Sequence, residues 1–249
     1  MYNIWIIAKR EYKMYFASPV AYMVIFILLL ILGIFFYLNV QVATSQLGGG
    51  YVPGVDSTLS PLAVLLMLIT PALTTRLLAE EQRLGTIELM LTAPVRDWEL
   101  VVGKWLGAFL LQLTIVAITF IYPLILNQLV KPGIDQGPLV SGYLGMILLC
   151  AALVGVGVMV SSFFSNQIAA FATTMGVLIF LWWIIGPIGQ VAGAASTGSE
   201  LISYFDFNGH YMNNLLQGVI DLKDVIFYLS ATALTLLLGS VSVEMRRWR

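Results

Sequence analysis

The sequence predicts an all-α integral membrane protein with six transmembrane helices, an amphipathic interfacial helix at the N-terminus, and both termini in the cytoplasm. Hydrophobic residues make up 59% of the 249 residues and charged residues only 10%, whereas soluble domains have about 45 to 50% and about 25%. No Asp, Glu, Lys or Arg occurs between Asp135 and Glu200. A water-soluble globule is therefore excluded, and the placement of the basic residues gives the orientation.

The first element, residues 3–16, has the pattern of an amphipathic helix. At 100° per residue one face is apolar and another is basic; the apolar face holds Ile4, Trp5, Ala8, Tyr12, Tyr15 and Phe16, and the basic face holds Lys9, Arg10 and Lys13. Such a helix lies in the plane of the membrane interface. Two interpretations stay open, a simple orientation anchor and a docking surface for a partner protein.

Six later segments are apolar enough for membrane spans, since a helix needs about 20 such residues to cross the hydrocarbon. They are residues 20–38, 59–75, 100–126, 140–164, 168–191 and 225–243. Pro71 and Pro187 lie inside the second and fifth spans, where a missing N–H kinks a helix. Lys104 lies one turn into the third span, and we expect its flexible side chain to extend so that the ammonium group reaches the membrane interface.

Lys and Arg are distributed unequally between the two sides of these spans. With the N-terminus inside, ten lie on inner segments and two, Lys131 and Lys223, on outer loops. An excess of basic residues marks the cytoplasmic side. The count therefore predicts that both termini are cytoplasmic, as an even number of spans requires.

Two connections are unusual in composition. The predicted cytoplasmic loop of residues 77–99, with the adjoining Lys104, carries eight of the 25 charged residues, and its residues 86–91 suit a short amphipathic helix before Pro94, with Asp97 able to cap the third span. The predicted outer loop of residues 192–224 is too apolar for a hydrated linker, so we expect short helices packed against the outer end of the spans. Asp221 and Asp224 directly precede the last span, where acids cap a helix.

Several kinds of chemistry are missing from the sequence. It has no P-loop motif, one histidine (His210) and one cysteine (Cys150), which excludes an internal disulfide and disfavours metal and protease sites. Net charge −1 gives no basic field for nucleic acid. The centres of the spans carry no charged residue of the kind that ion-coupled transporters use. The chain is therefore not expected to be an enzyme or to hold a metal or cofactor.

Two strings of the sequence resemble a known family. The residues RLLAEEQRLGTIELMLTAPVRDWELVVGKWLGAF (76–109) are similar to the cytoplasmic coupling segment of ATP-binding-cassette (ABC) permeases of the type 2 exporter family, especially the branch of gliding-motility and copper-processing permeases. The residues GVIDLKDVIFYLS (218–230) and the basic RRWR end (246–249) resemble that family's last outer loop and sixth span. The resemblance implies a single type 2 transmembrane domain over residues 1–249.

The resemblance also implies a function, partners and a site. The function is that of an exporter's permease subunit in a bacterial inner membrane, paired with a second permease copy or a paralogue and with separate ATPase subunits that bind ATP and Mg²⁺. An extracytoplasmic accessory protein is a further partner that it allows. The coupling role falls on Glu81, Arg83, Gly85, Thr86, Glu88 and Leu89, and a second docking surface on Trp5, Lys9, Arg10 and Lys13.

Two rival interpretations remain. A membrane anchor or assembly subunit would hold a cytoplasmic partner without moving a substrate, and the charged loop of residues 77–99 would then only anchor the chain. An intramembrane enzyme is disfavoured, because the sequence offers no nucleophile and base on the same side of the membrane. The sequence does not identify the substrate.

Overall fold

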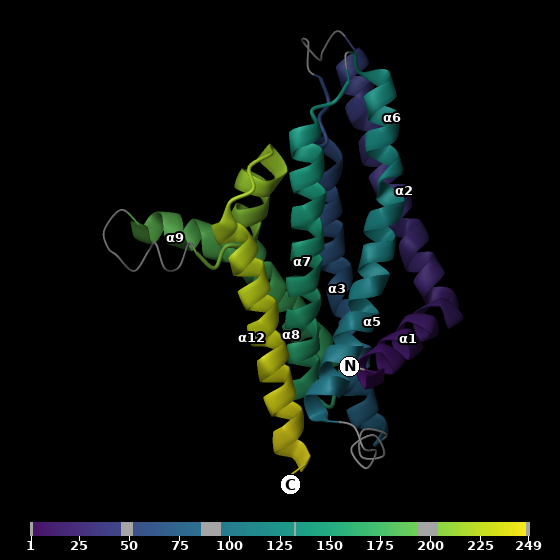
Figure 1. Ribbon diagram of the computed structural model, residues 1–249, viewed down its shortest axis with the longest axis vertical. Helices are drawn as coiled ribbons and strands as arrows, with labels where there is room; N and C mark the ends of the chain where they lie inside the picture. The colour runs from purple at the N-terminus through teal and green to yellow at the C-terminus, as the bar shows by residue number, and fades with distance from the viewer. Residues whose placement is uncertain (1, 46–51, 86–95, 132, 194–203, 248–249) are drawn as a thin grey trace.

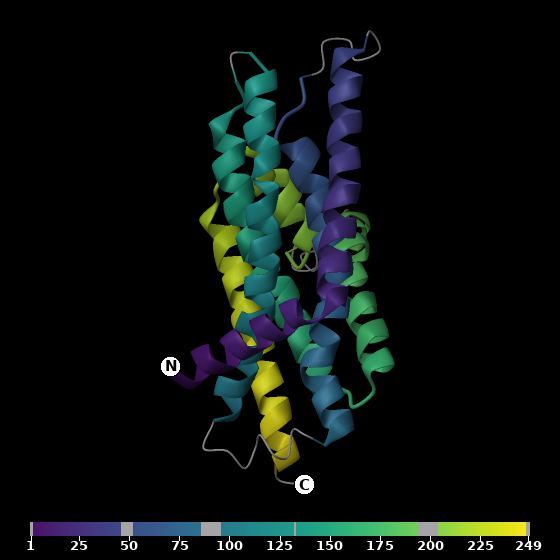
Figure 2. The same ribbon diagram turned by 90° about the vertical axis from the view of Figure 1, so that its right-hand side faces the viewer.

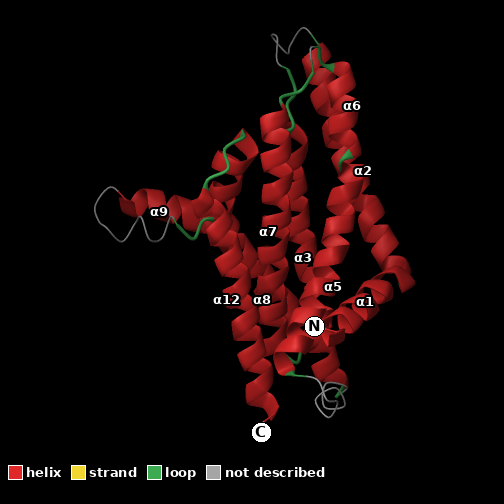
Figure 3. Ribbon diagram, in the orientation of Figure 1, coloured by secondary structure: helices red, strands yellow, loops and turns green. Residues whose placement is uncertain are grey.

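The computed structural model describes residues 2–45, 52–85, 96–131, 133–193 and 204–247, and the regular structure within these ranges is helical (Figure 3). The α-helices of more than one turn are α1 (Tyr2–Ala17), α2 (Pro19–Thr44), α3 (Asp56–Leu84), α5 (Asp97–Thr119), α6 (Ile121–Leu129), α7 (Gln136–Phe163), α8 (Gln167–Ile179), α9 (Ile185–Gly193) and α12 (Leu222–Arg247). Short helical turns at Phe180–Ile184 and Phe207–Gln217 complete the described chain.

The predicted fold class is confirmed. Six helical stretches are long and apolar enough to cross a membrane, with α5 and α6 forming one and α8 continuing into α9 to form another. They form an elongated bundle, and α1 and the last turns of α12 lie toward the same end of it (Figures 1 and 2). We call this the basal end. That the basal end faces the cytoplasm stays a prediction from the basic residues.

The most buried helix is α7, because small residues on its faces let neighbouring helices approach closely. A Cβ on Gly157 would lie 2.2 Å from the Thr74 hydroxyl of α3, and one on Gly155 would lie 2.4 Å from the Thr235 hydroxyl of α12. Close packing through small residues replaces the hydrophobic effect inside a membrane. By contrast α2 is mostly exposed, so one side of this apolar helix is left to lipid or to another chain.

Proline residues divide two of the six stretches. Pro123 has no N–H to bond the carbonyl of Thr119, and the α-helical hydrogen-bond pattern is interrupted between α5 and α6 at Phe120, whose N–H bonds the Ala117 carbonyl while its backbone stays right-handed. In the fifth stretch a π-helical turn at Phe180–Ile184 precedes Pro187, and both features bend helices. Figure 1 shows the result, since α9 runs across the bundle axis. A kink near Pro187 was expected, and the structure shows a change of direction in this part of the fifth stretch.

The described part of the predicted outer loop packs on the end of α7 that lies away from the basal end. Phe207, Tyr211 and Leu215 are buried, and a Cβ on Gly145 of α7 would lie 2.9 Å from Leu215. Short packed helices were expected here, and the described residues 204–217 fit that expectation. Residues 194–203 lie outside the described ranges.

The polar residues next to this segment fix its position on α12. His210 Nδ1 lies 2.6 Å from Asp224 Oδ1, and Asn214 donates to Asp224 Oδ2 at 2.9 Å. Asp221 accepts from the Lys223 backbone N–H and so caps α12. Asp221 acts as the expected cap, whereas Asp224 joins the two segments.

Candidate functional site

The candidate site lies where α1 packs across the basal part of α5. Gly103 and Gly107 face α1, where a Cβ on Gly103 would lie 2.8 Å from Ile7 and one on Gly107 would lie 2.6 Å from the Glu11 Cβ. No other residue type leaves room for this contact. The two glycines, spaced one turn apart, therefore form the seat of the amphipathic helix, which packs against protein along one face.

Four charged side chains meet where α1 crosses α5. Lys104 Nζ lies 3.1 Å from Glu11 Oε1 and 2.7 Å from Glu81 Oε1, the latter at the basal end of α3. Arg10 lies 2.9 Å from Glu11 Oε1 and 3.7 Å from Glu81 Oε1. We call these four residues the charge cluster. Two cations and two carboxylates balance, so α1, α3 and α5 share a neutral ionic contact.

Burial makes the charge cluster sensitive to the loss of any member. The Lys104 side chain is only 1% exposed, so the expectation that it reaches the interface was wrong. Its ammonium group instead bonds to two carboxylates that two other helices bring to it. Burial by itself raises the pKa of the Glu11 carboxyl, but the charges and hydrogen bonds of Lys104 and Arg10 outweigh burial, so the pKa lies below its usual value of 4.5.

A cavity of about 370 Å³ opens beside the charge cluster. Five of its seven lining residues are charged, and the lining comes from α1, α3 and α5: Glu11, Met14, Arg76, Glu80, Glu81, Leu84 and Lys104. Above Tyr15, the Arg76 guanidinium stacks at 4.3 Å from the ring centre, while the Tyr15 hydroxyl donates to the Leu73 carbonyl at 2.8 Å. These contacts fix α1 to α3 a second time.

Serine residues join the basal end of α3 to α7 and α12. Ser161 Oγ accepts from the Leu78 and Ala79 amides at 3.2 and 3.0 Å and donates to the Thr75 carbonyl. The Ser162 carbonyl accepts from Gln82 and Ser242. These serines therefore act as structural links between the three helices.

The predicted coupling residues are only partly described. Helix α3 continues to Leu84, and Gly85 ends it with φ 69°, a left-handed conformation that glycine adopts without strain. Arg83 is exposed on the last turn, and Glu81 points inward to the charge cluster. Thr86, Glu88 and Leu89 lie outside the described residues.

After the connection that follows α3, helix α5 begins at Asp97. Helices therefore occupy much of the expected loop of residues 77–99. The Glu99 carboxylate accepts from the Arg96 backbone N–H at 3.2 Å. We expected Asp97 to cap α5, but it is the first helical residue, and Arg96 holds the cap position.

The four residues of the predicted docking surface on α1 point in different directions. Arg10 turns to the charge cluster, while Trp5 and Lys9 line a groove between α1 and the more distant turns of α5. Lys13 is exposed. Arg10 is thus turned away from Trp5 and Lys9, and the docking role of the four residues stays a prediction.

Sequence reasoning missed two members of the charge cluster, Glu11 and Lys104. A signal for Glu11 was available: it falls at the same helical face as Ala8 and Tyr15, so an acid was placed where α1 packs on protein. The signal for Lys104 was its position between Gly103 and Gly107, whose spacing of four residues favours close packing of helices.

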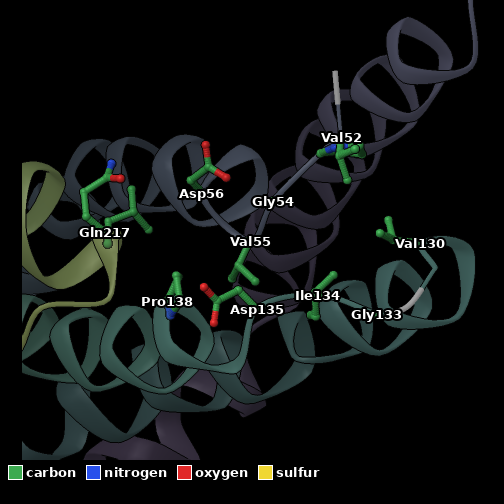
Figure 4. Close-up of a pocket in the computed structure, with 12 residues that line it drawn as sticks. Val52, Gly54, Val55, Asp56, Val130, Gly133, Ile134, Asp135, Pro138 and Gln217 are labelled. Atoms are coloured by element: carbon green, nitrogen blue, oxygen red, sulfur yellow. The ribbon is translucent and has the colours of Figure 1, made fainter. Parts of the chain in front are cut away.

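A second pocket, of about 240 Å³, lies at the opposite end of the bundle between the starts of α3 and α7 (Figure 4). Its two acids have structural roles. Asp135 accepts from the Gly137 backbone N–H at 2.9 Å and caps α7, and Asp56 stands in the first turn of α3, where the helix dipole favours a negative charge. Within the described ranges, no group of three or more metal-binding side chains is present.

The arrangement offers a mechanical connection, since the charge cluster joins three helices. The family model for ABC-2 family transporter proteins matches residues 38–241, most of the chain. No curated protein matches it significantly. With its six membrane-spanning helices and a family match over most of its length, the chain belongs to the ABC-2 transporter family and is a multi-pass permease subunit of an ABC transporter.

Proposed function

We propose that this permease subunit uses its basal end to couple ATP hydrolysis by separate ATPase subunits to the export of a substrate. The observation that carries the proposal is the charge cluster, in which Lys104 holds Glu11 and Glu81 within 3.1 Å. A displacement of the basal end of α3 must then also displace α1 and α5. Such a connection suits a subunit that receives motion from a partner.

The coupling contact is assigned to residues 77–99. Glu81 forms the inner end of the contact through the charge cluster, and the exposed Arg83 and Gly85 lead into the rest of the segment. Thr86, Glu88 and Leu89 complete the proposed contact, with Leu89 as its apolar anchor. The side of α1 that carries Arg10 is proposed as a second surface, since Met14 lines the cavity beside the charge cluster and Arg10 lies 3.7 Å from Glu81, which also lines it.

The remaining partners follow from the family. We infer a bacterial inner membrane, a second permease copy or a paralogue beside this one, and two ATPase subunits that bind ATP and Mg²⁺. The mostly exposed helix α2 is consistent with a second permease copy. The branch of gliding-motility and copper-processing permeases is our proposed placement within the family, and an extracytoplasmic accessory protein is an additional proposed partner.

The decisive experiment measures docking and transport separately. The permease and its ATPase are reconstituted in liposomes, and Leu89→Asp is compared with Val52→Asp, which places the same change on an exposed residue at the opposite end of the bundle. Truncation of an interface anchor costs about 2 kcal/mol or more, so Leu89→Asp should insert normally but lose ATPase co-purification and transport. Val52→Asp should retain both.

The alternative function, an anchor or assembly subunit, predicts a different result. ATPase association would persist in Leu89→Asp, and the reconstituted wild-type protein would show neither substrate transport nor substrate-stimulated ATP hydrolysis. Transport that persists without ATP when a proton or sodium gradient is imposed would contradict the proposed coupling as well.

A further inference from the structure

A groove between α1 and α5 has features that the coupling role does not use. It has a volume of about 300 Å³ and is lined by Trp5, Lys9, Tyr12, Leu110 and Thr114. The lining is almost entirely apolar apart from two hydroxyl groups and the lysine. The hydroxyl groups of Tyr12 and Thr114 lie 2.9 Å apart and form a hydrogen bond with each other, so they do not require a polar ligand as a partner.

The groove lies on the side of α1 that faces away from the basal end. Helix α5 begins at the basal end with Asp97 and contacts α1 at Gly103 and Gly107. Thr114 is seven residues beyond Gly107, which is about 10 Å farther along the helix axis. On the other side of α1, Met14 lines the cavity beside the charge cluster, and Arg10 lies 3.7 Å from Glu81 of that cavity. A partner that docks from the basal side therefore does not reach the groove directly.

The groove continues into an exposed apolar strip on the third span. Leu110 and Thr114 share a helical face with Ile121, and Ile118 and Ile121 are 43% and 55% exposed. In a membrane these side chains face hydrocarbon. An acyl chain that enters the groove between Trp5 and Leu110 can therefore extend along this strip without leaving apolar surroundings.

Charge complementarity determines the head group. Lys9 lines the groove, and Lys13 is exposed one turn along α1. Within the described residues neither lysine forms an ion pair, whereas Arg10 and Lys104 are both paired to acids. Basic residues on interfacial helices and basic pockets between spans attract anionic lipid head groups. The exposed indole of Trp5 stands beside them at the expected interface level.

We propose that the groove between α1 and α5 is a binding site for an anionic phospholipid. The phosphate group lies beside Lys9 and Lys13, and one acyl chain fills the groove along Trp5, Leu110 and Thr114. The bound lipid fills the space between α1 and α5 on the side of the Gly103 and Gly107 contact that lies away from the basal end. The site is independent of the ATPase contact proposed above.

The test uses the complete permease in phosphatidylcholine nanodiscs that contain a small fraction of lipid with brominated acyl chains. Bromine quenches tryptophan fluorescence at contact, and the signal of Trp5 is the difference between wild type and Trp5→Phe. Brominated phosphatidylglycerol should quench this signal more than brominated phosphatidylcholine at the same fraction. Lys9→Gln should weaken the apparent affinity for phosphatidylglycerol about fivefold, the change expected when one cation near a lipid surface is lost.

Two further variants keep the test specific. Lys223→Gln removes an exposed lysine from the start of α12, far from the groove, and should leave the lipid preference unchanged. Leu110→Trp fills the groove, and native mass spectrometry of this variant should show one fewer retained anionic phospholipid per chain than wild type. Both lysines are exposed, so neither change threatens the fold.

Two results would overturn the lipid site. Equal quenching by the two brominated lipids would show that Trp5 contacts only unselected membrane lipid. If Lys9→Gln kept the phosphatidylglycerol preference but no longer retained the ATPase, the groove would be a protein contact. Loss of ATPase coupling in Leu89→Asp with intact quenching would instead refute only the coupling role of that residue, so the two proposals fail separately.

Discussion

The charge cluster gives a sharp prediction through Lys104, the only one of its members supplied by α5. Lys104→Met keeps an unbranched chain of similar length and removes the charge. Glu11 and Glu81 would then face each other with Arg10 alone, whose guanidinium lies 2.9 and 3.7 Å from them and whose side chain is 47% exposed. The two carboxylates repel each other once the intervening ammonium group is gone.

The size of the effect follows from distance and burial. At 2.7 Å and an effective dielectric constant of about 20, the attraction between Lys104 and Glu81 is about 6 kcal/mol before desolvation is subtracted. Removing one partner of a buried ion pair costs about 3 to 5 kcal/mol, because the other charge stays buried without compensation. The double variant Lys104→Met with Glu81→Gln removes one charge of each sign, so it should be more stable than Lys104→Met alone.

Thermal unfolding of the detergent-solubilised protein measures this difference. A change of 1 kcal/mol shifts the melting temperature of a protein of this size by about 2 to 4 °C, so Lys104→Met should melt about 6 to 20 °C below wild type. The double variant should recover a clear part of that loss. Melting of Lys104→Met within about 2 °C of wild type, or strictly additive losses in the double variant, would refute the ionic connection between α3 and α5.

Three further predictions concern the seat of α1, its charge and its side of the membrane. Gly107→Ala places a Cβ against Glu11 and should cost about 1 to 3 kcal/mol, whereas Gly176→Ala, which meets open space, should not destabilise the protein. Folding lowers the pKa of Glu11, so the ionised Glu11 stabilises the protein fully at pH values above the usual pKa of 4.5, and this stabilisation is lost as the pH falls through the lowered pKa. The melting temperature of Glu11→Gln should lack this pH dependence. In a Cys150→Ala background, an impermeant thiol reagent added to intact cells should label a cysteine at Lys131 and not one at Gln82; the reverse pattern would invert the topology.

Much of the bundle could be predicted because its spans are long and apolar. Hydropathy identifies six segments with little ambiguity, and each overlaps one of the helical stretches of the structure. The bounds differ because helices extend beyond the apolar core into polar residues: α3 continues to Leu84 and α5 begins at Asp97. Hydropathy identifies the residues that lie within the hydrocarbon of the membrane, whereas the ends of the helices depend on local caps such as Gly85.

Tertiary contacts were harder to predict than spans, because periodicity assigns a face to a residue but not the neighbour of that face. The face of Ala8 and Tyr15 was recognised as apolar, yet Glu11 on the same side became meaningful only when α5 placed Lys104 opposite it. The direction of the bend before α9 could not be predicted for a similar reason. Pro187 predicted a disturbance, but its direction depends on the π-helical turn at Phe180–Ile184, which has no clear sequence signature.

The combination of glycines and charges at the α1 crossing explains why both are present. Gly103 and Gly107 allow close approach, but a smooth glycine surface does not by itself prevent α1 from sliding along α5. The ammonium group of Lys104, 3.1 Å from Glu11, favours a single register, because a shift of one helical residue, about 1.5 Å, lengthens that contact beyond hydrogen-bond range. A helix held in register transmits a displacement, whereas a sliding helix absorbs it. The charge cluster therefore gives the basal end the stiffness that the proposed coupling requires.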